Sequence, residues 1–173
     1  MIDPTWKRIC GIQCQDEGTI GAVWMAHEKP RDLIHVYDAC IFRNEVWAVI
    51  AEGLNCRGRN IPIAWNKKQK DIADKLLERG CNMLYDPLEE SAATTEVWSR
   101  EILERMKTGR FKVDKRIKEW LDEYQSYYRD ESEVPTDAFP LMAATRCAVS
   151  QLQYAKGKPK TNSRPMAPKL AII

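Results

Sequence analysis

The first forty residues place the strongest constraint on the fold of this chain. Three strand-like segments, 6–14, 19–27 and 33–42, are rich in β-branched, aromatic and other apolar residues. Short polar stretches at 16–18 and 28–32 separate them and carry the residues typical of turns. Strands joined by such short turns pair in antiparallel order. We therefore expect a three-stranded antiparallel meander, against which the rest of the chain must pack.

The remainder of the sequence predicts helices alternating with short strands. Apolar residues recur at helical spacing over 45–54, and a short apolar segment at 61–65 is typical of a buried strand. Further helices are expected over 71–78, 95–106, 114–124 and 141–152, with short strands at 82–85 and 110–113. With 173 residues, 44% of them hydrophobic, the chain can bury one core. The pattern predicts an α/β domain with a central mixed sheet flanked by helices.

Charge is nearly balanced along most of the chain. The 27 basic and 25 acidic residues leave a net charge of +2, which gives no strong signal for nucleic acid. The segment 156–169 differs, because it contains five basic residues, three prolines and no acidic residue. We divide the chain into a domain at 1–154 and a basic tail at 155–173. The tail is suited to contacting phosphates or a partner, and equally to being a solubilising terminus that contacts nothing.

The cysteines and the hydropathy exclude two classes of protein. The six cysteines lack the spacing of a zinc site, since Cys10 and Cys14 form an isolated pair where four ligands are needed. We expect reduced, mostly buried thiols. No apolar run approaches the length that a bilayer requires, and no signal peptide is visible. We therefore expect a cytoplasmic protein without a membrane partner.

Several segments, in the correct order, resemble the C-terminal nuclease domain of terminase large subunits from P22-like tailed phages. Segment 10–14 is similar to the first strand of that family, of the type Gly-Leu-Asp-x-Gly, and 61–65 to its Ile-Pro-Val-Ala-Trp strand. Segment 141–148 is similar to its closing Leu-Met-x-Ala-Thr-Arg-Tyr-Ala helix, with Cys147 in place of Tyr. Further similar segments are 22–27, 80–84 and 109–113. The resemblance covers nearly the whole of 1–154.

This resemblance implies a ribonuclease H-like fold and a metal-dependent DNA endonuclease that acts in viral genome packaging. It also implies a two-metal site for Mg²⁺ or Mn²⁺, with double-stranded DNA as substrate. The terminase ATPase, the small subunit and the portal are the implied protein partners, and the host-cell cytoplasm is the implied location. A Walker-type phosphate loop is missing from this sequence, so we expect no translocation of DNA by this chain alone.

The residues at the expected catalytic positions depart from the family pattern. Gln13 stands where the first acid is expected, and Asn66, followed by Lys67 and Lys68, where the second is expected. Near the third position the closest acid is Asp137. Gln13, Asn66 and Asp137 are therefore our candidate catalytic residues, and we expect them to converge on one cleft. Because amides bring no charge to a divalent ion, the activity expected is low or absent.

Three interpretations of the function consequently stay open, the most distant being an unrelated α/β enzyme that shares only the topology. The first is a terminase-type endonuclease, with Asp16 and Asp137 as the remaining candidate metal ligands. The alternative is a non-catalytic DNA- or terminase-binding module derived from the same fold. Asp38 and Asp86 are further candidate acids, and for each of these acids a turn, cap or strand-end role is the simpler interpretation. Basic residues predicted to contact DNA, or else to be solvated, are Arg57, Arg59, Lys67 and Lys68.

Overall fold

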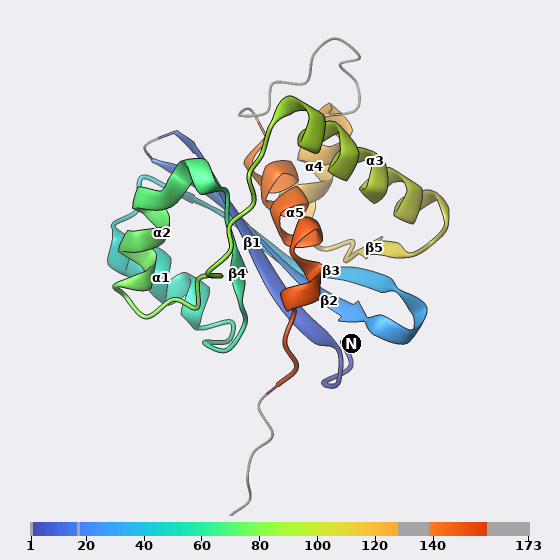
Figure 1. Cartoon of the computed structure of the whole chain (residues 1–173), viewed down its shortest axis with the longest axis horizontal. Coiled ribbons are helices and arrows are strands. Elements are labelled where there is room, and N and C mark those ends of the chain that lie inside the picture. Colours follow the sequence, from blue (N-terminus) through green and yellow to red (C-terminus); the bar gives the residue numbers. More distant parts are fainter. Residues whose placement is uncertain (1, 17, 128–138, 159–173) are drawn as a thin grey trace, which may run out of the picture.

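A sheet lies at the centre of the molecule, between two layers of helices (Figure 1). The computed structural model describes residues 2–16, 18–127 and 139–158. The first three strands are β1 (Lys7–Asp16), β2 (Thr19–Glu28) and β3 (Leu33–Arg43). β2 pairs antiparallel with both β1 and β3, which confirms the predicted meander.

Two short strands extend this meander at its edges. β4 (Ile63–Ala64) pairs parallel with β1, and β5 (Phe111–Val113) pairs parallel with β3. The strand order is β4-β1-β2-β3-β5, so the predicted mixed sheet is confirmed. The strand predicted at 82–85 is wrong: only an isolated bridge between Ile63 and Met83 forms there. Both backbone hydrogen bonds of this bridge involve Ile63, and the chain pairs again just beyond β4 through a second isolated bridge, between Asn66 and Leu88.

The helices divide between the two faces of the sheet (Figure 1). One face is covered by α3 (Ala92–Lys107), α4 (Lys118–Tyr127) and α5 (Pro140–Ser150). The other face is covered by α1 (Trp47–Asn55) and α2 (Lys70–Leu77). Each face has its own hydrophobic core, because alternate residues of β1 and β2 point to opposite sides.

The last helix, α5, packs most closely against the sheet. All eleven of its residues are buried. The close approach depends on two glycines: a Cβ on Gly11 would collide with Ala144 and Ala148, and a Cβ on Gly21 would collide with Pro140. Small residues on both elements therefore bring the start of α5 beside the beginning of β2 and the later turns of α5 beside the middle of β1.

Three predicted helix starts are wrong, each for a local reason. α3 begins at Ala92 because Ser91 and Thr94 form a capping box, whereas Thr95 bonds to Glu90 instead. The helix predicted from residue 114 begins at Lys118, since the Asp114 side chain holds a turn. α1 begins at Trp47, and the two valines at 46 and 49, predicted to face the core, are 66% and 48% exposed.

The described chain continues past residue 154 in contact with the sheet. Ala155 is buried, and Lys156 forms an antiparallel bridge with Arg8 of β1. All six cysteines are free thiols, and three of them, Cys10, Cys81 and Cys147, are buried. Within the described ranges, no helix combines the length and the apolar character that a membrane span needs.

Candidate active-site cavity

Gln13 and Asn66 line the same cavity, of about 370 Å³. Gly11 of β1 pairs in register with Ala64 of β4, and the same parallel register carried two residues on sets Gln13 beside Asn66. Both side chains point to the face covered by α5, because they alternate in phase with Gly11 and Ala64. Gln13 is only 5% exposed and Asn66 only 3%. Gly21, which contacts the start of α5, is the residue opposite Gln13 on β2.

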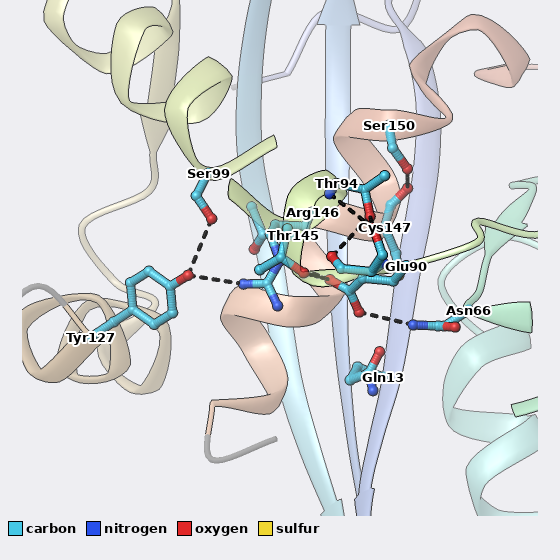
Figure 2. Close-up of polar contacts among 12 residues, drawn as sticks. Gln13, Asn66, Glu90, Thr94, Ser99, Tyr127, Thr145, Arg146, Cys147 and Ser150 are labelled. Atoms are coloured by element: carbon cyan, nitrogen blue, oxygen red, sulfur yellow. Dashed lines mark hydrogen bonds and ion pairs between the residues drawn. The ribbon is translucent and has the colours of Figure 1, made fainter. Parts of the chain in front are cut away.

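The two amides are held differently (Figure 2). The Asn66 Oδ1 accepts a hydrogen bond from the backbone N–H of Lys68 at 3.0 Å, and its Nδ2 donates to Glu90 Oε2 at 2.8 Å. Gln13 Nε2 donates to the Cys14 carbonyl at 3.2 Å, while its Oε1 is buried without a partner among the described residues. Asn66 is thus fixed on both sides, whereas Gln13 presents a free acceptor.

Glu90 brings a carboxylate to this cavity that sequence reasoning missed. It precedes the N-cap of α3, and both of its oxygens are engaged. Oε1 accepts from Thr95 Oγ1 at 3.1 Å and from Arg146 Nε at 3.1 Å, and Oε2 accepts from Asn66. The one sequence signal that could have indicated it is its position just before a helix start, and acidic residues are common there.

Arg146 of α5 neutralises the Glu90 carboxylate, with its Nε 3.1 Å from Glu90 Oε1 (Figure 2). Its side chain is 2% exposed and that of Glu90 is 10% exposed. Arg146 Nη1 also donates to the Tyr127 hydroxyl at 3.2 Å, and that hydroxyl lies 3.1 Å from Ser99 Oγ. A buried polar chain therefore connects the cavity to α3 and α4.

The remaining walls of the cavity come from the segment after β4 and from the start of α3. The Gln69 side chain bonds both backbone groups of Cys14, at 3.0 and 2.7 Å, and so closes the edge of β1. Lys68 lies between Asn66 and Gln69 in the short 3₁₀ helix η2 (Lys67–Gln69). From α3 the cavity is lined by Ser91, Ala92 and Thr95.

The other predicted basic residues are not brought to this cavity. Arg57 lies over the Trp24 ring at 4.3 Å and forms an ion pair with Asp38, on the face of the sheet covered by α1. Arg59 is exposed, and Lys67 pairs with Glu89 at 3.3 Å. Of the basic residues predicted to contact DNA, Lys68 alone lines the cavity.

The candidate acids are also dispersed. Asp86 is exposed and accepts from the Tyr154 hydroxyl at 3.3 Å. Asp16 is the last residue of β1, three positions beyond Gln13, and its side chain is not described. Asp137 lies outside the described residues, so its predicted position at the start of the last helix stays a prediction.

A second cavity, of about 480 Å³, lies beside the first and shares Gln15 with it. Its most unusual residue is Glu123 of α4, whose Oε2 accepts from the backbone N–H groups of Leu141 and Met142 at 2.9 and 3.1 Å. Burial raises the pKa of Glu123 to about 7, against the effect of these two hydrogen bonds. Glu123 is therefore a cap for α5, with a proton equilibrium near neutral pH.

The fold of this chain is that of large terminase nuclease domains. The chain superimposes on the nuclease domain of the phage P22 large terminase with a TM-score of 0.77 and 21% identity, over 91% of this chain and 87% of that one. The nuclease domain of the phage SPP1 large terminase, solved with bound Mn, gives 0.61 and 13%, over 85% and 87%. The predicted ribonuclease H-like fold is confirmed.

A larger protein has the same fold in only part of its length. The chain matches the large terminase of a thermophilic bacteriophage with a TM-score of 0.69 and 10% identity, covering 89% of this chain but 42% of that one. No protein-family model and no curated protein sequence matches the chain. The similarity to these structures is therefore one of fold.

The described residues do not fit a two-metal centre. Such a centre needs several carboxylates around two divalent ions. In the cavity as described, Glu90 is the one carboxylate, and Arg146 neutralises it. Across the described ranges, no group of three or more His, Cys, Asp or Glu side chains is placed to hold a metal ion.

Proposed function

We propose that this chain is a terminase-type domain that binds double-stranded DNA in viral genome packaging and has little or no hydrolytic activity. The fold of the P22 and SPP1 terminase nuclease domains supports the packaging role. The proposed loss of activity rests on one observation: the cavity at the expected catalytic positions contains two amides and a neutralised carboxylate. Terminase subunits or the portal are the proposed protein partners, and the host cytoplasm is the proposed location.

The charge balance of the cavity explains why hydrolysis should be weak. At 4 Å, a unit negative charge interacts with a unit positive charge by about 4 kcal/mol at an effective dielectric constant of about 20, and more with a divalent ion. Gln13 and Asn66 contribute no such term, and Glu90 already interacts with Arg146. Tight binding of Mg²⁺ or Mn²⁺ at this cavity is therefore not expected.

A second candidate function is a metal-dependent endonuclease that still cuts DNA. The unpartnered Gln13 Oε1 favours it, because a buried acceptor oxygen is a suitable ligand for a hard cation. In this case Asp16 and Asp137 would have to supply the missing charge. The two functions make different predictions for the same measurements.

Metal binding and plasmid nicking distinguish them. We expect the natural chain to show weak calorimetric binding of Mn²⁺ and little nicking of supercoiled plasmid. The double variant Gln13→Asp/Asn66→Asp should bind Mn²⁺ at least about 100-fold more tightly, because it adds two charges at the cavity. Neither substitution enlarges a side chain, so neither should introduce a steric clash.

The contact between Asn66 and Glu90 adds a second readout. Asn66→Asp would place a carboxylate against Glu90 Oε2, where the amide now donates at 2.8 Å. In EDTA, the melting temperature of the Asn66→Asp variant should be lower than that of the natural chain. It should rise again with Mn²⁺, because ligand binding stabilises the folded state. Tight Mn²⁺ binding and robust nicking by the natural chain would reject our proposal, and loss of that nicking in Asp16→Asn or Asp137→Asn would establish the second candidate.

A further inference from the structure

The start of α5 is capped by another helix. Its own N-cap residue, Phe139, makes no side-chain hydrogen bond to the helix, and Pro140 occupies the first turn. The cap comes from α4, because Glu123 Oε2 accepts from the backbone N–H groups of Leu141 and Met142 at 2.9 and 3.1 Å. These N–H groups belong to the first turn of α5, where no carbonyl of the helix can accept from them. One carboxyl group of α4 therefore satisfies the start of α5.

Two further side chains of α4 meet α5 on the same side. Trp120 Nε1 donates to Thr145 Oγ1 at 2.9 Å, and the Tyr127 hydroxyl accepts from Arg146 Nη1 at 3.2 Å. Positions 120, 123 and 127 are spaced by three and four residues, so they lie on one face of α4. Of these three α4 side chains, Glu123 is the carboxylic acid, so its ionisation changes the charge at the contact.

The two oxygens of Glu123 have different roles. Both N–H groups of α5 bond to Oε2, and no described residue donates a hydrogen bond to Oε1. A proton on Oε1 would leave both bonds in place, because Oε2 would remain a carbonyl acceptor. The neutral acid can therefore keep the cap that the carboxylate makes.

The surroundings of Glu123 disfavour its negative charge. It lines the cavity of about 480 Å³ together with Glu119 and Asp122, two further acids of α4. Arg43 of β3 is the basic residue that lines this cavity as described, and it pairs with Glu119 at 3.4 Å. β1, β2 and the first turn of α5 line it with uncharged residues. Burial raises the pKa of Glu123 to about 7 although the two N–H bonds oppose it, and Glu119 adds to the rise while Arg43 reduces it.

We propose that the contact of Glu123 with the start of α5 is a proton-dependent latch, closed while Glu123 is neutral and loosened when its carboxylate ionises. Loosening frees the first turn of α5 and widens the cavity of about 480 Å³, because residues of both α4 and α5 line it. The latch is independent of the proposed function, since it needs neither DNA nor a metal ion.

The direction of the pH effect follows from the proton affinities of the two states. The pKa of Glu123 is about 7 in the closed latch, and an open latch exposes the side chain and returns the pKa toward its ordinary value of 4.5. The closed state therefore binds the proton more tightly. Its advantage is complete below pH 4.5 and is lost as the pH rises to 7. The latch is consequently strongest in mild acid and weakest above neutral pH.

Carbon-13 NMR of the natural chain measures the proton equilibrium directly. The side-chain carboxyl signal of Glu123 should titrate with a midpoint near pH 7, whereas that of the exposed Glu96 should titrate in the ordinary range for glutamate. A midpoint for Glu123 at or below that of Glu96 would overturn the inference. The titration uses the natural chain, so it does not depend on how any variant folds.

Hydrogen exchange measures the latch itself. After correction for the intrinsic exchange rate, protection of the Leu141 and Met142 amides should fall at least about tenfold between pH 5 and pH 7. Glu123→Gln should show no such fall, because its amide oxygen can still accept from α5 and its charge does not change. Asp122→Asn is the matched control and should keep the fall, since it removes an exposed carboxylate of α4 that does not bond to α5. Constant protection in the natural chain, or an equal fall in Glu123→Gln, would overturn the inference.

Discussion

At the scale of single residues, the Glu90–Arg146 ion pair determines the character of the cavity. Both side chains are buried, and the pair is completed by Asn66, Thr95 and Tyr127. A buried pair of this kind adds little net stability, but removing one partner leaves a charge without compensation. Glu90 and Arg146 are 56 positions apart in the sequence, so only the fold brings them together.

We predict that Arg146→Met lowers the free energy of unfolding by about 3–5 kcal/mol, because it leaves the Glu90 carboxylate buried without a cation. Urea denaturation measures this loss. The double variant Glu90→Gln/Arg146→Met should recover part of the stability. Arg100→Gln, which breaks an exposed pair with Glu96, is the control and should cost less than about 1 kcal/mol. Similar costs for Arg146→Met and Arg100→Gln would contradict the role given to the buried pair.

At the scale of elements, the contact of α5 with β1 and β2 positions the cavity. The sequence indicated a helix of small residues here, and the structure shows that glycines on the strands are equally necessary. Gly11 lies against Ala144 and Ala148, and Gly21 lies against Pro140. Because Gln13 is two residues beyond Gly11 on the same face, any outward movement of α5 would also disturb the cavity.

Gly11→Ala is expected to destabilise the fold by at least about 1–3 kcal/mol, the usual cost of overpacking a core. The added methyl group would collide with the Ala144 carbonyl, which is backbone and cannot rotate away. Gly157→Ala is the matched control, because nothing lies within 4 Å of the added carbon. Thermal unfolding of the two variants measures the difference. Equal melting temperatures would show that α5 can move away from β1 at little cost.

At the scale of the whole molecule, the contacts of β1 extend beyond the predicted domain boundary at residue 154. Lys156 bridges Arg8, and the Gly157 carbonyl accepts from Asn60 Nδ2 at 3.3 Å. A truncation that tests the basic tail should therefore keep these residues. Removal of 159–173 eliminates three basic residues and leaves the described domain intact: these are Lys160, Arg164 and Lys169.

Deletion of residues 159–173 should weaken duplex binding and lower its salt slope by about 1 to 3, according to how many of the three cations contact phosphates. The measurement is fluorescence anisotropy over a range of salt concentrations, with the melting temperature as a control for folding. An unchanged slope would identify the tail as a terminus that takes no part in binding DNA.

The sequence alone determined the sheet and the two amide positions. The meander follows from apolar segments separated by short polar turns, and the placement of Gln13 and Asn66 follows from ordered segments with a family resemblance. These signals lie within short stretches of the sequence, so they can be recognised without knowledge of the tertiary structure. Helix starts were less predictable, because capping by Ser91 and the turn at Asp114 compete with apolar periodicity.

Only the tertiary structure decided which charges share the cavity. It placed Lys68 at the cavity but paired the neighbouring Lys67 with Glu89, outside the cavity, and it placed Arg57 on the opposite face of the sheet. It also brought Glu90 and Arg146, which are distant in the sequence, into contact with each other, and Glu90 into contact with Asn66. Electrostatic character depends on distances and burial between side chains from different elements. A chain whose segments resemble a nuclease can therefore carry, at the same place, a cavity whose described carboxylate is already neutralised by a buried cation.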